Sequence, residues 1–338
     1  MKIAFFKLEP QERKYIEQDK ELKKLGCEFL FIKEAINKAN FKKYADVEII
    51  STFRTKVTAD TLKYFPNLKF IATRSTGYDH IDFKAVKKLG ITVSNVPSYG
   101  DETVAEYTFG LILVLARKIA DAYDRLREKG QFSIKGLRGF ELNKKTLGVI
   151  GTGRIGKNVV RIASGFEMKV LAYDLYPDAT YAKKMGFEYV SLKKLLSCAD
   201  IVTLHVPLTE KTKHLINEKA LKLMKSSAYL VNTSRGGCVE TKALVKALQN
   251  KVIAGAALDV LEEEGALQDE LGFLLERNVK GEVLSTLLAN HIFIDLPNVI
   301  VTPHNAFNTI EALQRILDGT IENIVAFMKK KPVNVVSK

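Results

Sequence analysis

Short hydrophobic runs alternate with helical patterns from the start of the chain. Each run is rich in β-branched or aromatic residues and is followed by a stretch whose apolar positions recur with helical periodicity. Because parallel strands need crossover connections and cover on both faces, the alternation predicts an open parallel sheet between two layers of helices. The strands predicted for this first lobe are residues 2–6, 28–32, 47–52, 69–73 and 91–95.

A longer helical pattern follows, from residue 101 to about residue 129. Asp101 and Glu102 favour its start through the helix dipole, and Gly130 supplies an end. Residues 104–116 are almost wholly apolar, so we expect this part to be buried between two lobes or against a partner subunit.

The alternation then restarts and predicts a second lobe. Six strands in one lobe match the doubly wound arrangement that binds dinucleotides. Residues 307–327 predict one more helix, which is too short to form a domain and should return to pack on the first lobe. The strands predicted for the second lobe are residues 146–150, 169–174, 201–206, 228–231, 253–258 and 298–302.

Composition narrows the class of protein. The longest apolar run, residues 109–116, is far shorter than the roughly 20 residues needed to cross a bilayer, so we expect no membrane partner. The N-terminus lacks a secretory signal, which favours a cytoplasmic location. The formal net charge is +13, but lysines occur in pairs with acidic residues nearby, so we expect no nucleic-acid partner. Three widely spaced cysteines match no metal site, and we expect none.

The strongest local motif is G-x-G-x-x-G between a predicted strand and a predicted helix. Gly151 permits a tight turn, Gly153 lets the backbone approach a pyrophosphate, and Gly156 allows close packing of helix on strand. Asp174 ends the next strand, 23 residues beyond Gly151, where an acid accepts hydrogen bonds from a ribose 2′-hydroxyl and repels a 2′-phosphate. We therefore predict NAD as the cofactor in preference to NADP.

Three ionisable residues follow later strands of the second lobe, at the strand ends where doubly wound sheets bind ligands. Arg235 could hold a carboxylate with its bidentate fork, and His304 could protonate a developing alkoxide. Glu264, hydrogen-bonded to the far ring nitrogen, would stabilise the charged imidazole. Together the three fit the reduction of a 2-oxo acid by NADH. Separately, each has a simpler interpretation as a surface charge, a packed histidine or an exposed acidic turn.

At this point the sequence resembles the D-isomer-specific 2-hydroxyacid dehydrogenases, and within them the D-lactate dehydrogenase branch. The resemblance spans nearly the whole chain and rests on the glycine motif, Asp174 and the segments at residues 74–79, 96–99, 204–209, 232–236, 257–260 and 302–304. With the strand pattern, it predicts an α/β fold of two doubly wound parallel-sheet lobes with a cleft between them. These are a discontinuous flavodoxin-like substrate (catalytic) domain, residues 1–100 plus 306–338, and a Rossmann NAD-binding domain, residues 101–305.

The resemblance also implies a role for each candidate residue. Arg235 would bind the substrate carboxylate and polarise the carbonyl, His304 would donate and accept the proton, and Glu264 would orient His304. Most members pair as homodimers through the long helix and neighbouring segments of the cofactor lobe. The positions that match substrate contacts are Thr76 and Gly77, through their backbone amides, with Tyr99, Arg235 and Phe307. Those that match cofactor contacts are Gly151, Gly153, Arg154, Ile155, Gly156, Asp174, Val206, Pro207, Thr212, Thr233, Ser234 and Asp259.

Two features depart from the pattern of many relatives. Gly265 stands where proline commonly follows the catalytic glutamate, so the choice among the glutamates at residues 262–264 depends on counting five positions from Asp259. The interval of 40 residues from the last of them to His304 includes a predicted helical insert at about residues 267–289. That spacing resembles the lactate-type branch.

Two alternatives stay open beside a dehydrogenase for pyruvate and D-lactate. One is a NAD-sensing protein that binds partners through dimer surfaces, as corepressors that resemble the family do. The other is a dehydrogenase for phosphohydroxy acids or bulkier 2-hydroxy acids. The positive charge favours a phosphorylated substrate, whereas the lactate-type spacing does not.

Overall fold

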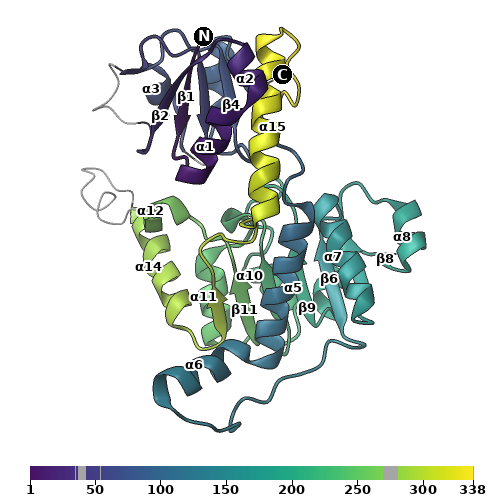
Figure 1. Ribbon diagram of the computed structural model, residues 1–338. Coiled ribbons are helices and arrows are strands. Elements are labelled where there is room, and N and C mark those ends of the chain that lie inside the picture. The colour runs from purple at the N-terminus through teal and green to yellow at the C-terminus, as the bar shows by residue number, and fades with distance from the viewer. Residues whose placement is uncertain (35, 37–42, 54, 269–280, 338) are drawn as a thin grey trace. The chain divides into compact units, whose positions relative to one another are not determined.

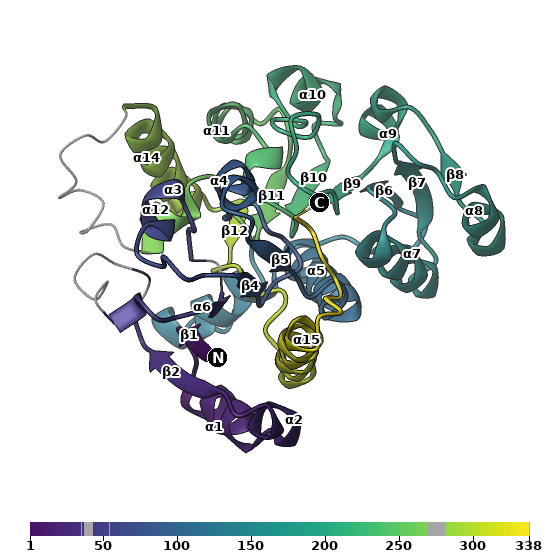
Figure 2. The same ribbon diagram turned by 90° about the horizontal axis from the view of Figure 1, so that it is seen from above.

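The chain folds into two compact units, each built on its own parallel sheet. The computed structural model describes residues 1–34, 36, 43–53, 55–268 and 281–337. One unit comprises Met1–Tyr99 and Asn308–Lys338, and the other comprises Gly100–Phe307. Figure 1 shows the sheet and helices of each unit, and Figure 2 shows them from above.

The first unit contains a five-stranded sheet with the strand order 2-1-3-4-5 of a doubly wound flavodoxin-like fold. Every strand predicted for the first lobe is confirmed to within two residues. Side chains alternate between the two faces, so that Phe6 packs towards α3 and α4 and Phe5 packs towards α1, α2 and α15. In sheet order the strands are β2 (Glu28–Ile32), β1 (Lys2–Phe6), β3 (Ile49–Thr52), β4 (Phe70–Thr73) and β5 (Thr92–Ser94). The helices are α1 (Pro10–Gln18), α2 (Lys20–Lys24), α3 (Ala59–Leu62), α4 (Phe83–Lys88) and α15 (Ile310–Met328).

Helix α15 confirms the helix predicted near the C-terminus. It begins after Thr309, whose side chain accepts a hydrogen bond from the amide of Ala312. Its apolar face, including Leu317 and Ile324, packs against β4, α1 and α2 of the first unit.

The second unit contains a seven-stranded parallel sheet. The sequence pattern predicted six of these strands and missed β8, which has only two residues and no hydrophobic run. The strand order reverses between β6 and β9, and in such sheets ligands bind at the carboxyl ends of the strands beside this switch point. In sheet order the strands are β12 (Val299–Val301), β11 (Gly255–Leu258), β10 (Tyr229–Asn232), β9 (Ile201–Leu204), β6 (Thr146–Ile150), β7 (Lys169–Tyr173) and β8 (Glu188–Tyr189).

Helices cover both faces of this sheet (Figure 2). Leu230 and Val231 on β10 illustrate the alternation, because Leu230 packs among α9, α10, α11 and α14, whereas Val231 packs among α5 and α7. Part of the predicted insert forms helix, and residues 269–280 lie outside the described residues. The helices are α5 (Asp101–Arg117), α7 (Arg154–Gly165), α8 (Ala179–Met185), α9 (Leu192–Cys198), α10 (Glu218–Leu223), α11 (Thr241–Gln249), α12 (Glu264–Gln268) and α14 (Gly281–Asp295), with a 3₁₀ turn, η2, at Gly236–Cys238.

The single long helix predicted from residue 101 is wrong. Lys118 adopts a left-handed conformation with φ +56° and separates α5 from α6 (Ile119–Lys129). No glycine marks this break, so the sequence carried no signal for it. The apolar stretch of α5, including Phe109 and Ile112, is buried against α7, β10 and β11 of its own unit, so no partner subunit is needed to cover it.

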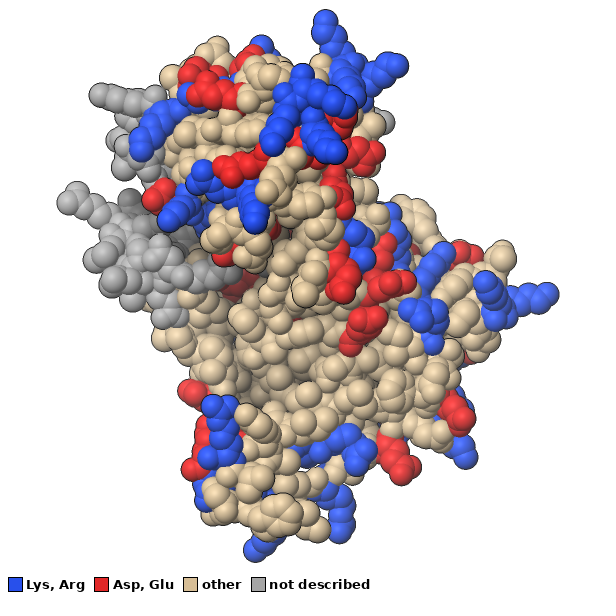
Figure 3. All heavy atoms as spheres, viewed as in Figure 1, with Lys and Arg blue, Asp and Glu red and all other residues tan. Residues whose placement is uncertain are grey.

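Surface charges of both signs are intermixed. On the face drawn in Figure 3, both units carry Lys and Arg side chains as well as Asp and Glu side chains. Several lysines pair with acids at short range, such as Lys69 with Glu48 and Lys157 with Asp178, both at 2.6 Å. Among the described residues, no helix has the length and apolarity needed to span a membrane.

Candidate active site

The glycine-rich turn joins β6 to α7 and leaves room for a phosphate. A Cβ at Gly156 would lie 2.0 Å from the carbonyl oxygen of Gly151, and one at Gly151, which has φ +93°, would lie 2.6 Å from the carbonyl oxygen of His205. A Cβ at Gly153 would meet no described atom within 4 Å. Two glycines are therefore required by the chain's own packing, whereas Gly153 keeps the start of α7 open to an anion.

The carboxylate of Asp174, which follows β7, is tied to the same turn. Its Oδ2 accepts hydrogen bonds from the amide of Thr152 at 2.6 Å and from the hydroxyl of Thr152 at 3.0 Å. That hydroxyl also lies 2.8 Å from the hydroxyl of Tyr189 on β8. The acid expected at the ribose is thus fixed beside the phosphate-binding turn. Sequence reasoning missed Thr152 and Tyr189, although Thr152 stands inside the glycine motif.

Four further positions predicted to contact the cofactor lie on this edge of the sheet. Arg154 is the first residue of α7, and its Nε lies 3.3 Å from the carboxylate of Asp101. Ile155 is partly buried against the core beneath α7. Val206 is half-buried and Pro207 is exposed, and both follow the end of β9.

The hydroxyls of the other predicted contacts are engaged within the chain. The Thr233 hydroxyl lies 2.9 Å from that of Thr108 on α5, and the Ser234 hydroxyl donates to Asn232 Oδ1 at 2.8 Å. The hydroxyl of Thr212 bonds within its own turn. These three side chains therefore shape the loops after β9 and β10.

The adjacent strands β11 and β12 bring Glu264 and His304 together. Nδ1 of His304 lies 2.6 Å from Oε1 of Glu264. An ionised carboxylate can only accept, so Nδ1 donates and Nε2 is the ring nitrogen left to exchange a proton. The His304 ring also meets Phe307 edge-on, with the ring centroids 6.4 Å apart. The arrangement suits a general acid and base.

Asp259, which follows β11, fixes the loop that carries His304. Its Oδ1 accepts from the Thr302 hydroxyl at 2.6 Å and from the Asn305 amide at 2.8 Å, and its Oδ2 accepts from the Ala306 amide at 2.9 Å. Burial raises the pKa of Asp259, and the three hydrogen bonds oppose that shift by stabilising the carboxylate. A residue expected to contact the cofactor therefore holds the acid–base candidate in place.

Arg235 follows β10, the strand next to β11. Its Nη1 donates to the Ser234 carbonyl at 2.7 Å, and Asn232 Nδ2 donates to the Arg235 carbonyl at 2.9 Å. Gly236 packs directly on the turn after β11, because a Cβ there would lie 2.0 Å from the carbonyl carbon of Leu261. The three predicted catalytic side chains therefore follow three adjacent strands, and the turns after the first two are in contact.

The three consecutive glutamates have different surroundings. Glu264 pairs with His304, whereas Glu262 Oε1 accepts from Nε2 of His214 at 2.7 Å. Glu263 is exposed and has φ +55°. Sequence reasoning did not find the pair of Glu262 and His214, because no motif connects these distant positions.

In the first unit, side chains hold the carbonyls of the loop after β4. Ser75 Oγ donates to the Gly77 carbonyl at 2.6 Å, and Asn95 Nδ2 donates to the Thr76 carbonyl at 2.7 Å. Thr76 Oγ1 donates to the Val96 carbonyl at 2.9 Å. Within the described part of the chain, the amides of Thr76 and Gly77 donate to no acceptor. Two amide donors in a loop with restrained carbonyls can bind an anion.

Two more residues of the motifs in the first unit are buried. Tyr99 is 8% exposed, and its carbonyl accepts from Nε of Arg315 on α15 at 2.8 Å. Arg74 precedes the Thr76 loop, and its Nη2 donates to the carbonyls of Phe6 at 2.7 Å and Lys7 at 3.1 Å. Burial lowers the pKa of the Arg74 guanidinium to about 10. Arg74 thus ties the start of this loop to the end of β1.

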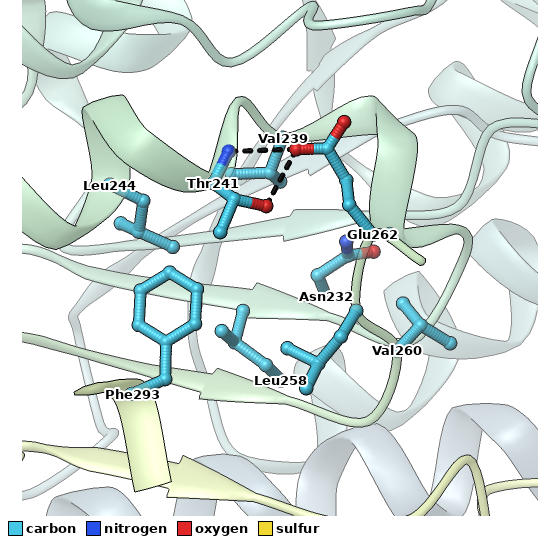
Figure 4. A pocket seen from close by; sticks show the side chains of 10 residues that line it. Asn232, Val239, Thr241, Leu244, Leu258, Val260, Glu262 and Phe293 are labelled. Carbon is cyan, nitrogen blue, oxygen red and sulfur yellow. Dashed lines mark hydrogen bonds between the residues drawn. The ribbon is translucent and has the colours of Figure 1, made fainter. Parts of the chain in front are cut away.

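A small cavity lies behind the turn after β11 (Figure 4). Its volume is about 10 Å³, the size of a single water, and Asn232, Glu262 and Phe293 are among its lining residues. A 2-oxo acid or a dinucleotide is far too large for it. The cavity therefore belongs to the interior that supports the site.

Comparison with known proteins identifies the family. The matching family model is the D-isomer specific 2-hydroxyacid dehydrogenase, NAD binding domain, over residues 109–306. The chain is 39% identical over 328 residues to a 2-hydroxyacid dehydrogenase homolog of Zymomonas mobilis, covering 96% of each chain. It is 38% identical over 330 residues to the D-lactate dehydrogenase of Escherichia coli, again covering 96% of each. The D-lactate dehydrogenase from Aquifex aeolicus, solved with NAD and lactic acid, gives a TM-score of 0.85 at 37% identity, covering 97% of this chain and 96% of that one.

The chain therefore belongs to the D-isomer-specific 2-hydroxyacid dehydrogenases. It is a NAD-dependent oxidoreductase of the D-2-hydroxyacid dehydrogenase class. The residues of the glycine turn fit this cofactor, because Gly153 leaves the start of α7 open and Asp174 lies beside the same turn.

Proposed function

We propose that the chain interconverts a small 2-oxo acid and its D-2-hydroxy acid, with pyruvate and D-lactate as the preferred pair. The observation that carries the proposal is the 2.6 Å contact between Nδ1 of His304 and Glu264, which leaves Nε2 to exchange a proton. The names of the relatives from Escherichia coli and Aquifex aeolicus support lactate. Bound NAD supplies the two-electron redox chemistry.

His304 moves the proton in this proposal. During reduction, Nε2–H donates to the carbonyl oxygen of the substrate as that oxygen becomes a hydroxyl, and during oxidation Nε2 takes the proton back. Glu264 stabilises the protonated ring by accepting from Nδ1, and the same bond orients the ring. The rings of Phe307 and His304 are perpendicular, with centroids 6.4 Å apart, and we assign Phe307 to the substrate pocket beside His304.

Arg235 binds the substrate carboxylate and polarises the carbonyl to be reduced, since a guanidinium presents a fixed fork of donors. In the first unit, we assign the amides of Thr76 and Gly77 to the carboxylate and Tyr99 to the substrate pocket. The restrained carbonyls of the Thr76 loop support this assignment. Of the cofactor contacts, the glycine turn is assigned to the pyrophosphate and Asp174 to the ribose hydroxyls.

The protein is also proposed to be a homodimer that forms through α6 and the segment after it. None of the residues of α6 is buried, and its apolar side chains recur with helical periodicity on one face. Light scattering should therefore give twice the chain mass of 37.8 kDa, and L126E should shift the protein towards a monomer. A monomeric wild type would contradict this part of the proposal. The exposed apolar residues are Ile119, Tyr123, Leu126, Phe132 and Ile134.

The test of the reaction is a panel of 2-oxo acids with NADH and NADPH in parallel. The panel contains pyruvate, a branched and an aromatic 2-oxo acid, and a phosphorylated one, and the near-ultraviolet absorbance of the reduced cofactor is followed. We expect the highest kcat/KM with pyruvate and NADH, and D-lactate as the product. Preference for another acid would overturn the lactate assignment. No turnover with any acid, in protein that binds NADH, would overturn the proposed reaction.

A further inference from the structure

The turn after β11 is held by bonds from several separate elements, and most of them end on Glu262. Oε1 of Glu262 accepts from Nε2 of His214 at 2.7 Å. Oε2 accepts from the amide of Thr241 at 3.0 Å and from its hydroxyl at 2.6 Å, and Figure 4 shows both bonds. The backbone carbonyl of Glu262 accepts from Nδ2 of Asn290 at 2.8 Å. Glu262 therefore joins the start of α11, the segment after β9 and helix α14.

This fixation is stronger than a surface ion pair would provide. Thr241 is the first residue of α11, so its amide is one of the donors that a helix start leaves for outside acceptors, and the helix dipole favours a carboxylate there. The Glu262 side chain is only 18% exposed, and Asn290 is fully buried. Gly236, in the turn after β10, also packs against the backbone of Leu261 without room for a Cβ.

The same turn carries Glu264, two residues further on. Glu263 between them has φ +55°, a conformation that is costly for a residue with a side chain and that other bonds must hold in place. Only Glu263 separates Glu262 from Glu264. A shift of Glu262 would therefore displace the Glu264 carboxylate, which accepts from Nδ1 of His304. It would also reach Arg235, because Gly236 rests on this turn.

We propose that Glu262 is a positioning residue, which fixes the turn so that Glu264 meets His304. Glu262 contributes no proton and touches no reacting atom. It acts through Glu264, and its kinetic effect rests on the proposed acid–base role of His304. The expected loss on substitution is on the order of 10- to 100-fold in kcat/KM, because a displacement of about 1 Å in a catalytic group has that size of effect.

A double-mutant cycle between Glu262 and Glu264 tests whether one acts through the other. E262Q should lower kcat with little change in NADH affinity, and E264Q should lower it at least as much. In the E264Q background, E262Q should then have little further effect, because the carboxylate whose position Glu262 fixes is already replaced by a neutral amide. The control is E263Q, which removes the exposed carboxylate of the same turn and should leave kcat unchanged. Independent, multiplicative losses from E262Q and E264Q would overturn the proposal.

A spectroscopic experiment tests the positioning role of Glu262 without any substrate. In protein with ¹⁵N-labelled histidine, the five imidazoles can be assigned by substitution, and ring shifts at alkaline pH report which nitrogen carries the proton. His304 of the wild type should carry it on Nδ1. In E264Q we expect a mixture of the two His304 tautomers, and E262Q should shift His304 towards the same mixture. A loss of stability alone would not change the tautomer of the folded protein. An unchanged His304 spectrum in E262Q would refute the positioning role.

A milder variant keeps the test open if E262Q folds poorly. T241V removes only the hydroxyl bond to Glu262 and keeps the amide bond, so the same changes should appear at smaller size. Absence of both the kinetic and the spectroscopic change in folded T241V and H214Q would overturn the proposal. If the wild type turned over no 2-oxo acid, the proposed function would fail, but the tautomer measurement would still decide the inference.

Discussion

Two histidine–glutamate pairs share one turn of the second unit and differ in which partner is buried. In the pair of His304 and Glu264, the histidine side chain is 15% exposed and the glutamate 34%. In the pair of His214 and Glu262, the order is reversed, at 37% and 18%. In each pair the surrounding chain holds the more buried partner, through Asp259 for the loop of His304 and through Thr241 and Asn290 for Glu262. The amide of Leu261 also donates to Oε2 of Glu264, at 3.4 Å.

These two pairs show that a histidine and a glutamate can have different roles in the same turn. His304 donates to Glu264 through Nδ1, so that Nε2 can bind a ligand, whereas His214 donates to Glu262 through Nε2. A histidine held by its surroundings and oriented by a carboxylate suits proton transfer. A carboxylate held by its surroundings, with a half-exposed histidine attached, suits the anchoring of a turn.

The largest expected difference between the pairs is in turnover. H304Q should lower kcat by about 10²- to 10⁴-fold with NADH binding retained, because it removes the proposed proton donor. H214Q should lower kcat by no more than about 10-fold, because Glu262 keeps its bonds to Thr241 and one hydrogen bond is worth roughly 1 kcal/mol. Steady-state rates with the preferred 2-oxo acid and NADH titration of each variant give both quantities. Equal losses in the two variants would remove the distinction between the pairs.

Sequence reasoning found one pair and missed the other for a physical reason. His304 and Glu264 stand at strand ends whose convergence follows from the doubly wound fold, and a known motif surrounds each of them. His214 follows no strand directly and reaches Glu262 only because the loop after β9 packs against the 3₁₀ turn η2. The amides of His214 and Ile216 donate there to the carbonyls of Gly237 and Cys238. Such loop packing depends on tertiary contacts that leave no periodic pattern.

The same limit applies to the fold. Strands with a clear hydrophobic run were predicted in both units, whereas the two-residue β8 and the break at Lys118 were not. In the site, the glycine turn and Asp174 follow from a motif with a fixed spacing. The bond from Thr152 to Asp174 and the hold of Asp259 on the His304 loop depend on side-chain directions. A sequence pattern specifies which residues reach the edge of a sheet, but not which of them bond to each other.

The substitution G236A should disturb both histidine–glutamate pairs at once. G236A forces a Cβ to within 2.0 Å of the carbonyl carbon of Leu261, and the crowded atoms are backbone, which cannot rotate away. The free energy of unfolding should fall by about 1 to 3 kcal/mol, with a loss of activity larger than that of H214Q.

The matched control for this variant is G265A on α12, where a Cβ would meet no atom of the described residues within 4 Å. It should be neutral or stabilising by up to about 1 kcal/mol, because alanine favours helix over glycine. Urea unfolding of both variants measures the difference. A G236A protein as stable and as active as the wild type would mean that the turns after β10 and β11 are not in contact.

The smallest expected effect concerns the residue between the two glutamates. Glu263 has φ +55°, which glycine adopts freely, so E263G should raise the free energy of unfolding by up to about 1 kcal/mol, less the entropy that glycine adds to the unfolded chain. E263A, which keeps a Cβ, should bring no gain, and the difference between the variants isolates the backbone contribution. If Glu262 holds the turn as proposed, kcat of E263G should stay close to that of the wild type despite the freer backbone. A loss of kcat in E263G with kcat retained in E263A would show that the left-handed residue itself, and not the bonds of Glu262, keeps Glu264 against His304.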